Sequence, residues 1–176
     1  MKKNSVALIG FMATGKTTVG KALAEYLGDA YKFIETDQII IELVGKNIPD
    51  IFSEEGEDKF REYEILACEK VSSLTNIVVS CGGGVVLNKI NIKNLKKNSH
   101  IVLLEASVEE IFKRAMKDGK ETRPVINKED PKKEIENVLN FRKPYYEEAA
   151  EYIIETTGKD IENIVEEIAK KTRLKT

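Results

Sequence analysis

The segment GFMATGKT at residues 10–17 matches the phosphate-binding loop pattern G-x-x-x-x-G-K-[ST] at every fixed position. It follows a short apolar run at 6–9 and precedes a stretch at 18–27 whose apolar residues recur at helical spacing. A strand, a glycine loop and a helix N-terminus in this order form a nest of backbone N–H groups that binds phosphate oxygens. The alternative, a chance match in a glycine turn, is disfavoured by the correct flanks on both sides. The sequence therefore predicts a nucleotide phosphate site.

Individual residues of this loop have distinct expected roles. Lys16 is expected to act in catalysis by contacting the β- and γ-phosphates, and the Thr17 hydroxyl is expected to bind Mg²⁺. We therefore expect Mg²⁺ as the cofactor and a nucleoside triphosphate as a co-substrate. The residues expected to hold this nucleotide are Ala13, Thr14, Gly15, Lys16, Thr17 and Thr18.

Strand-like and helical stretches alternate along the whole chain. Strands are predicted at 5–9, 31–35, 77–80, 101–104 and 152–155, and helices at 16–27, 37–44, 57–72, 91–96, 108–117, 131–150 and 161–172. Strands separated by helices form right-handed crossovers and a parallel sheet that is covered on both faces. The pattern predicts one α/β domain over residues 1–176, with three α/β/α layers and a five-stranded parallel sheet. Ligands bind such sheets at the carboxyl ends of the strands.

Charge and hydropathy exclude several classes of partner. The 176 residues carry a net charge of −2, so no basic surplus exists to neutralise nucleic acid phosphates. The apolar runs are far shorter than the roughly 20 residues that cross a bilayer. Residues 1–4 run straight into the first predicted strand, so we expect no signal peptide and a cytoplasmic location. Nothing in the sequence indicates an obligate interface, and a monomer is expected.

The second predicted strand ends in Glu35-Thr36-Asp37. An extended segment places residues 35 and 37 on the same side. One carboxylate would hold Mg²⁺ through water, and the other would accept a proton or a hydrogen bond from a substrate hydroxyl. The alternative is that Asp37 caps a helix starting at Gln38, a position that Asp favours.

The third predicted strand ends in Ser80-Cys81 and three consecutive glycines, residues 82–84. Consecutive glycines are entropically costly, and they make sense where a ligand lies directly against the backbone. A wide turn is the alternative. Ser80 stands where many P-loop proteins carry an acidic residue, so its hydroxyl would hold a Mg²⁺-bound water or simply end the strand.

Arg61, Arg123 and Arg142 stand out among the charged residues. Each alone is more often a surface charge, and their importance depends on whether they converge. Two stretches rich in turn formers and charges, 45–56 and 117–131, are predicted to be mobile covers. For the second, a solvated connector is the alternative, although Arg123 lies in its middle.

These motifs, in this order, resemble the shikimate kinase family over nearly the whole chain. The resemblance rests on the loop at 10–17, the acidic pair around Thr36, the segments 48–52 and 56–61, the triple glycine, Thr122-Arg123-Pro124 and the segment 142–146. It implies the P-loop kinase strand order 2-3-1-4-5. It also implies ATP-dependent phosphorylation of shikimate at its 3-hydroxyl, in chorismate and aromatic amino acid biosynthesis.

The resemblance assigns roles to particular residues. Asp37 would orient the reacting hydroxyl as a catalytic residue, and Arg61 and Arg142 would bind the carboxylate, for which a guanidinium is a natural bidentate partner. Arg123 would be a catalytic, ATP-contacting arginine in a lid at about 117–131. Arg114 would lie beside the adenine, with the segment 156–160 as the other wall. A substrate-binding region is implied at about 36–61. The implied shikimate-binding set is Asp37, Arg61, Gly82, Gly83, Gly84 and Arg142.

This chain departs from the family pattern at Glu35, and two other functions remain as alternatives to the one that the resemblance implies. The family commonly has Asp-x-Asp where this chain has Glu35, whose longer side chain leaves open whether it meets Mg²⁺ directly or through water. Another small-metabolite kinase, acting on gluconate or a nucleotide, is a close alternative. A nucleotide-dependent switch is a more distant one, because the guanine-reading motif Asn-Lys-x-Asp has only the incomplete match Asn88-Lys89-Ile90-Asn91.

Overall fold

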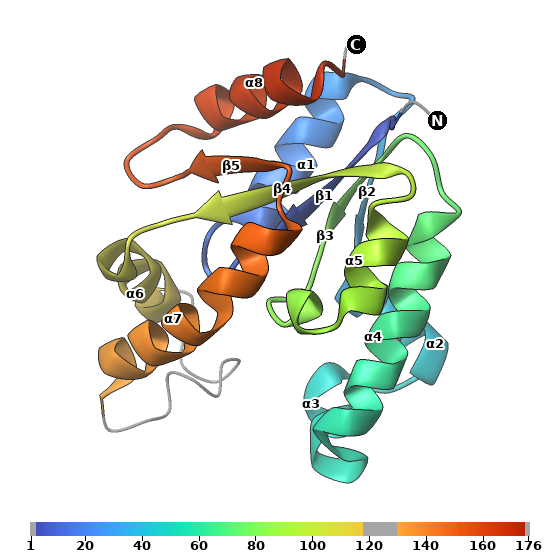
Figure 1. Ribbon diagram of the computed structural model, residues 1–176, viewed down its shortest axis with the longest axis vertical. Helices are drawn as coiled ribbons and strands as arrows, with labels where there is room; N and C mark the ends of the chain where they lie inside the picture. Colours follow the sequence, from blue (N-terminus) through green and yellow to red (C-terminus); the bar gives the residue numbers. More distant parts are fainter. Residues whose placement is uncertain (1–2, 118–129, 175–176) are drawn as a thin grey trace.

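The centre of the molecule is a five-stranded parallel sheet in a computed structural model that describes residues 3–117 and 130–174 (Figure 1). The strands are β1 (Ser5–Ile9), β2 (Lys32–Glu35), β3 (Ile77–Ser80), β4 (Ser99–Glu105) and β5 (Tyr152–Glu155). Each neighbouring pair is parallel, and the order across the sheet is β2-β3-β1-β4-β5. The predicted α/β class and strand order are confirmed.

Helices connect these strands along the chain, and the last helix follows the last strand. The helices are α1 (Lys16–Leu27), α2 (Thr36–Val44), α3 (Ile48–Glu54), α4 (Gly56–Ser72), the short 3₁₀ helix η1 (Val85–Leu87), α5 (Lys89–Leu95), α6 (Val108–Lys117), α7 (Pro131–Ala149) and α8 (Ile161–Thr172). Within residues 3–117 and 130–174, no helix has both the length and the apolar character needed to cross a membrane.

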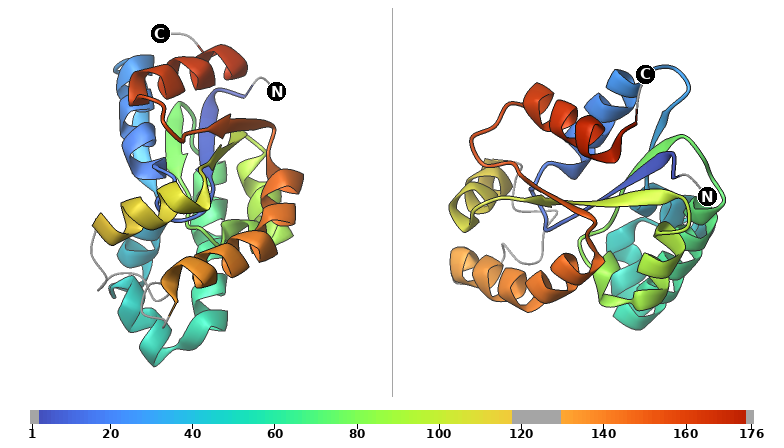
Figure 2. Two further views of the ribbon diagram at one scale, coloured as in Figure 1. Left: turned by 90° about the vertical axis from the view of Figure 1, so that its left-hand side faces the viewer. Right: turned by 45° about the horizontal axis from the view of Figure 1, so that its top comes forward.

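Alternate residues of the central strands point into two separate apolar cores. In β1, Val6 and Leu8 pack with α1 and α8 on one face of the sheet. Ala7 and Ile9 pack on the other face with residues from α4, α5 and α7. Figure 2 shows both helical layers and the sheet between them. Because both faces are covered, the strands read as continuous apolar runs, and the carboxyl ends of the strands stay open to ligands.

The segment 45–56, predicted to be a mobile cover outside the core, contains the helix α3 and contributes to the core. Pro49 lies in the first turn, where a missing N–H group costs nothing, and Ile51 is fully buried in the core. The Lys46 Nζ lies 2.8 Å from carboxylate oxygens of both Glu54 and Glu55. Most of the predicted lid at 117–131, including Arg123, lies outside the described residues.

Candidate active site

A cleft of about 610 Å³ opens at the carboxyl ends of β1, β2 and β3. Residues from the phosphate-binding loop, from the end of β2 and from the glycine segment line it together. The predicted site residues on its walls are Ala13, Thr14, Gly15, Lys16, Thr17, Thr18, Glu35, Asp37, Ser80, Gly82, Gly83 and Arg114. Segments far apart in the sequence therefore meet at the edge of the sheet where the fold class places ligands.

The phosphate-binding loop has the backbone that its glycines allow. Gly10, Ala13 and Gly15 have φ angles of 142°, 57° and 95°. A Cβ atom on Gly10 would collide with the carbonyl oxygen of Leu104 in β4, so only glycine fits there. The Lys16 Nζ donates to the carbonyl oxygens of Gly10 (2.9 Å) and Phe11 (2.7 Å). The lysine is thereby held over the loop, beside the N-terminus of α1, whose dipole favours anions.

Three oxygen-bearing side chains that were predicted to serve Mg²⁺ lie on adjoining elements. The Thr17 hydroxyl donates to Glu35 Oε1 at 2.7 Å. Ser80, which is buried, pairs in register with Glu35 on β2 and with Leu8 on β1. Hydroxyl and carboxylate oxygens suit Mg²⁺, which usually takes one or two protein ligands together with substrate phosphates and water. The residues present therefore fit a Mg²⁺ ion that arrives with a nucleotide.

Asp37 faces the glycine segment from the first turn of α2. Helix α2 begins at Thr36 with Glu35 at its N-cap, so the alternative of Asp37 as a helix cap is wrong. A Cβ atom on Gly82 would lie 3.2 Å from Asp37 Oδ1, and the Gly82 N–H donates to Thr36 Oγ1 at 3.0 Å. Although part of Asp37 is in contact with solvent, desolvation by the surrounding atoms of the cleft raises the pKa of its carboxyl. The charge of Lys16 lowers this pKa, and the charge of Glu35 raises it.

Arg61 and Arg142 converge on neighbouring glycines from different helices. On α4, Arg61 lies against Gly84, where an added Cβ atom would be 2.6 Å from its Nη2. On α7, Arg142 lies against Gly83, with 3.4 Å from an added Cβ atom to its Nη1. Its buried Nε has no hydrogen-bond partner within residues 3–117 and 130–174. The triple glycine therefore makes room for side chains of the site, whereas the sequence had predicted only room for a ligand.

Two residues without a predicted role hold this region together. Glu64 is 1 % exposed and accepts hydrogen bonds from Arg61 Nη1 (3.1 and 3.2 Å) and from Asn91 Nδ2 (3.2 Å). Burial raises the pKa of Glu64, and Arg61 opposes that shift. The Tyr146 hydroxyl donates to the Gly83 carbonyl oxygen at 2.5 Å. A sequence signal for Glu64 existed, because it is the one acid in a buried helical stripe with Phe60, Ala67 and Val71.

The position of Gly84 leads to a testable expectation. In Gly84→Ala, the new Cβ atom would displace the Arg61 guanidinium, since it would lie 2.8 Å from Cζ. Because a flexible side chain can move away, we expect little loss of stability but about a tenfold loss of affinity for a carboxylate-bearing acceptor. Steady-state kinetics and thermal melting of Gly84→Ala, Arg61→Ala and the double variant check this. Additive losses in the double variant would contradict an action through Arg61.

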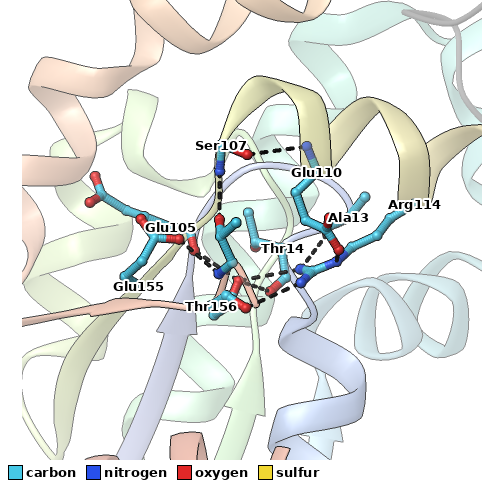
Figure 3. Close-up of polar contacts among 9 residues, drawn as sticks. Ala13, Thr14, Glu105, Ser107, Glu110, Arg114, Glu155 and Thr156 are labelled. Carbon is cyan, nitrogen blue, oxygen red and sulfur yellow. Dashed lines mark hydrogen bonds and ion pairs between the residues drawn. The ribbon is translucent and has the colours of Figure 1, made fainter. Parts of the chain in front are cut away.

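Arg114 lies at the other end of the cleft, where α6 meets the segment after β5 (Figure 3). Its Nε donates to Glu110 Oε1 at 2.8 Å, and its Nη2 donates to the Thr156 carbonyl oxygen at 3.2 Å. Its Nη1 reaches the Ala13 carbonyl oxygen at 3.3 Å. Arg114 therefore ties α6 to the phosphate-binding loop. Lys117 and Lys159 also line this end of the cleft. Lys159 belongs to the segment 156–160 expected beside the adenine, and no separate role was predicted for Lys117.

The sequence matches one known protein family over most of its length. The model of the family described as shikimate kinase matches residues 12–173. The chain belongs to the shikimate kinase family. A shikimate kinase of Caldanaerobacter subterraneus subsp. tengcongensis is 42% identical over 166 residues, which cover 94% of each chain.

Solved structures agree with this assignment. The shikimate kinase from Acinetobacter baumannii in complex with shikimate superposes with a TM-score of 0.87 and 34% identity, covering 96% of this chain and 92% of that one. A gluconokinase from Sinorhizobium meliloti superposes with a TM-score of 0.62 at 19% identity, a likeness that shows a common fold alone. Membership of the shikimate kinase family favours a shikimate acceptor over gluconate or a nucleotide, and a catalyst over a switch.

Proposed function

We propose that the chain transfers the γ-phosphoryl group of ATP to the 3-hydroxyl of shikimate, giving shikimate 3-phosphate for chorismate and aromatic amino acid biosynthesis. The observation that carries this proposal is the match to the shikimate kinase family over residues 12–173. The converging arginines beside the phosphate-binding loop support it, because they suit an acceptor that bears a carboxylate.

The donor half of the proposed site is built on the loop at 10–17. Its amide groups and the α1 N-terminus would bind the phosphates, and Lys16 would stabilise the charge that develops on the transferring group. Arg114 would lie beside the base. Arg123, outside the described residues, is proposed to bring a second cation to the phosphates when the lid at 117–131 covers them.

The acceptor half lies around the triple glycine. Arg61 and Arg142 would bind the shikimate carboxylate. The buried Nε of Arg142, which has no partner among the described residues, is a donor that such a ligand would satisfy. Asp37 would accept a hydrogen bond from the reacting hydroxyl and orient it toward the γ-phosphate. Its raised pKa makes it a better proton acceptor than an ordinary aspartate. Closure of the region at 36–61 would exclude water from the reaction.

Thr17, Glu35 and Ser80 are the residues proposed to hold Mg²⁺, directly or through water. When bound, this ion neutralises charge on the β- and γ-phosphates. The contribution of the chain is the fixed position of the Thr17 hydroxyl, which Glu35 orients by accepting a hydrogen bond from it at 2.7 Å.

Replacing Glu35 by glutamine is expected to raise the Mg²⁺ concentration needed for half-maximal activity about five- to tenfold, because it removes a charged acceptor. Activity measured across a Mg²⁺ titration at fixed ATP tests this. Glu35→Asp should restore most of the loss. Glu42→Gln is the matched control. Glu42 lies on α2, the helix that follows Glu35, but it is absent from the cleft walls. An unchanged titration curve for Glu35→Gln would remove Glu35 from the proposed metal site.

We further propose that the protein acts as a cytoplasmic monomer that binds no nucleic acid. The net charge of −2 supports the last point. Size-exclusion chromatography with light scattering tests whether the protein is a monomer, and a mass near twice 19.8 kDa would contradict this.

The proposed reaction is tested by ADP release with ATP·Mg²⁺ and a panel of acceptors comprising shikimate, gluconate and nucleoside monophosphates. Of these acceptors, only shikimate should stimulate ADP release above the background measured without acceptor. Stimulation by gluconate or by a nucleotide, without stimulation by shikimate, would replace the proposed acceptor.

A further inference from the structure

Thr156, the first residue after β5, joins three parts of the nucleotide end of the cleft (Figure 3). Its backbone N–H donates to the Glu105 carbonyl oxygen at the end of β4, at 2.8 Å. Its hydroxyl lies 2.8 Å from the same carbonyl oxygen and 3.4 Å from the carbonyl oxygen of Thr14 in the phosphate-binding loop. With only 1 % of its surface exposed, Thr156 makes these contacts away from bulk water.

Arg114 contacts Thr156 through two different nitrogens. Nη1 donates to the Thr156 hydroxyl oxygen at 3.3 Å, and Nη2 donates to its carbonyl oxygen at 3.2 Å. The other contacts of this guanidinium are Glu110 on its own helix and the Ala13 carbonyl oxygen. A guanidinium is planar, so acceptors along more than one edge fix both the position and the tilt of its plane. Thr156 supplies two of those acceptors.

The hydroxyl of Thr156 can contact both partners at once because it can donate one hydrogen bond and accept others. A hydroxyl has one proton to donate and lone pairs with which to accept. Donating to the Glu105 carbonyl leaves the oxygen free to accept from Arg114, so one group links β4 to α6. Valine has nearly the same shape but offers neither function, which leaves a half-buried guanidinium N–H of Arg114 with one acceptor fewer.

We propose that Thr156 is a positioning residue for nucleotide binding, which acts by holding Arg114 and the loop backbone at Ala13 and Thr14 in one fixed arrangement. This inference rests on the proposed function, in which Arg114 lies beside the base of ATP. It goes further by assigning the order of this end of the cleft to a side chain outside the phosphate-binding loop and the acceptor site.

The test compares ADP binding by the unaltered chain, Thr156→Val and Thr156→Ser, measured by calorimetry with Mg²⁺ and without shikimate. Thr156→Val is expected to raise the Kd for ADP about tenfold, and Thr156→Ser, which keeps the hydroxyl, is expected to stay within about twofold. In steady-state kinetics the KM for ATP should rise by the same factor. The KM for shikimate should stay constant, and kcat should change less than the KM for ATP.

Thr172→Val is the matched control. Thr172 is another buried threonine whose hydroxyl donates to a backbone carbonyl, that of Ile168 at 2.8 Å, and it lies on α8 outside the cleft walls. Both valine variants should lose some thermal stability, but only Thr156→Val should lose ADP affinity.

A lowered melting temperature for Thr156→Val with unchanged ADP affinity would overturn the positioning role and leave the proposed function standing. Absence of ADP binding by the unaltered chain would overturn both. If Thr156→Val does not fold, Thr156→Cys replaces it, since a thiol keeps the size but is a weaker hydrogen-bonding group. Unchanged ADP affinity in Thr156→Cys would then overturn the proposal.

Discussion

Replacing Lys16 by methionine is expected to lower kcat about 10³-fold, because the variant loses the cation that stabilises charge on the transferring phosphoryl group. The Lys16 Nζ lies over the loop, 2.9 Å from the Gly10 carbonyl oxygen and 2.7 Å from that of Phe11. Methionine keeps the length of the side chain without its charge. The KM for shikimate should change little, since the proposed acceptor contacts come from α2, α4 and α7. Steady-state kinetics with both substrates varied measure the effect.

Lys21→Met is the matched control for Lys16→Met. Lys21 lies one and a half turns further along α1, and its Nζ lies 5.8 Å from the centroid of the Phe33 ring, away from the cleft walls. Its variant should keep kcat within about twofold, as expected for a surface substitution. A loss below tenfold for Lys16→Met would show that the loop binds phosphate without its lysine contributing to transfer.

The second large effect is expected from Arg142→Lys, which should raise the KM for shikimate about 100-fold while the KM for ATP stays within about threefold. Lysine keeps the charge but has a single ammonium group in place of a planar fork. The surroundings of the Arg142 side chain explain why its shape and position matter. Arg142 lies against Gly83, its Cζ is 6.0 Å from the centroid of the Phe11 ring, and its Nε is buried without a partner in the described part of the chain.

Lys143→Gln serves as its control, because Lys143 is the next residue on α7 and pairs with Glu147 at 3.8 Å outside the main cleft. It should leave the KM for shikimate nearly unchanged. If Arg142→Lys behaved like Lys143→Gln, the carboxylate would have to be bound elsewhere, and the acceptor half of the site would need to be redrawn.

The sheet was predictable because burial on both faces leaves a simple mark in the sequence. Each predicted strand agrees with the observed one to within two residues, as with β4, predicted at 101–104 and observed at Ser99–Glu105. The spacing of apolar residues predicted the alternating strands and helices and therefore the three layers. The strand order was predicted from the family resemblance. Helix α3 was missed because Pro49 and the flanking Gly45 and Gly56 are typical of turns. Its helical state depends on the burial of Ile51, a tertiary effect that local pattern does not report.

The site was predictable wherever a residue type has one dominant use. Lys16, Thr17 and the loop glycines belong to a pattern whose chemistry fixes their spacing. The role of Gly84 was only half predicted, because its fit against Arg61 depends on how α4 packs beside the glycine segment. Glu64 and Thr156 contact partners 27 and 42 positions away, Asn91 and Arg114. The buried stripe of α4 could mark Glu64 as unusual, but no local pattern reports contacts over such separations.

Phosphate transfer to shikimate is tested by identifying the product by ³¹P and ¹H NMR after incubation with ATP·Mg²⁺ and shikimate. We expect one phosphorylated product, with the phosphate on the 3-hydroxyl and one ADP formed per product molecule. Formation of ADP and inorganic phosphate alone, or a phosphate on another hydroxyl, would contradict this expectation.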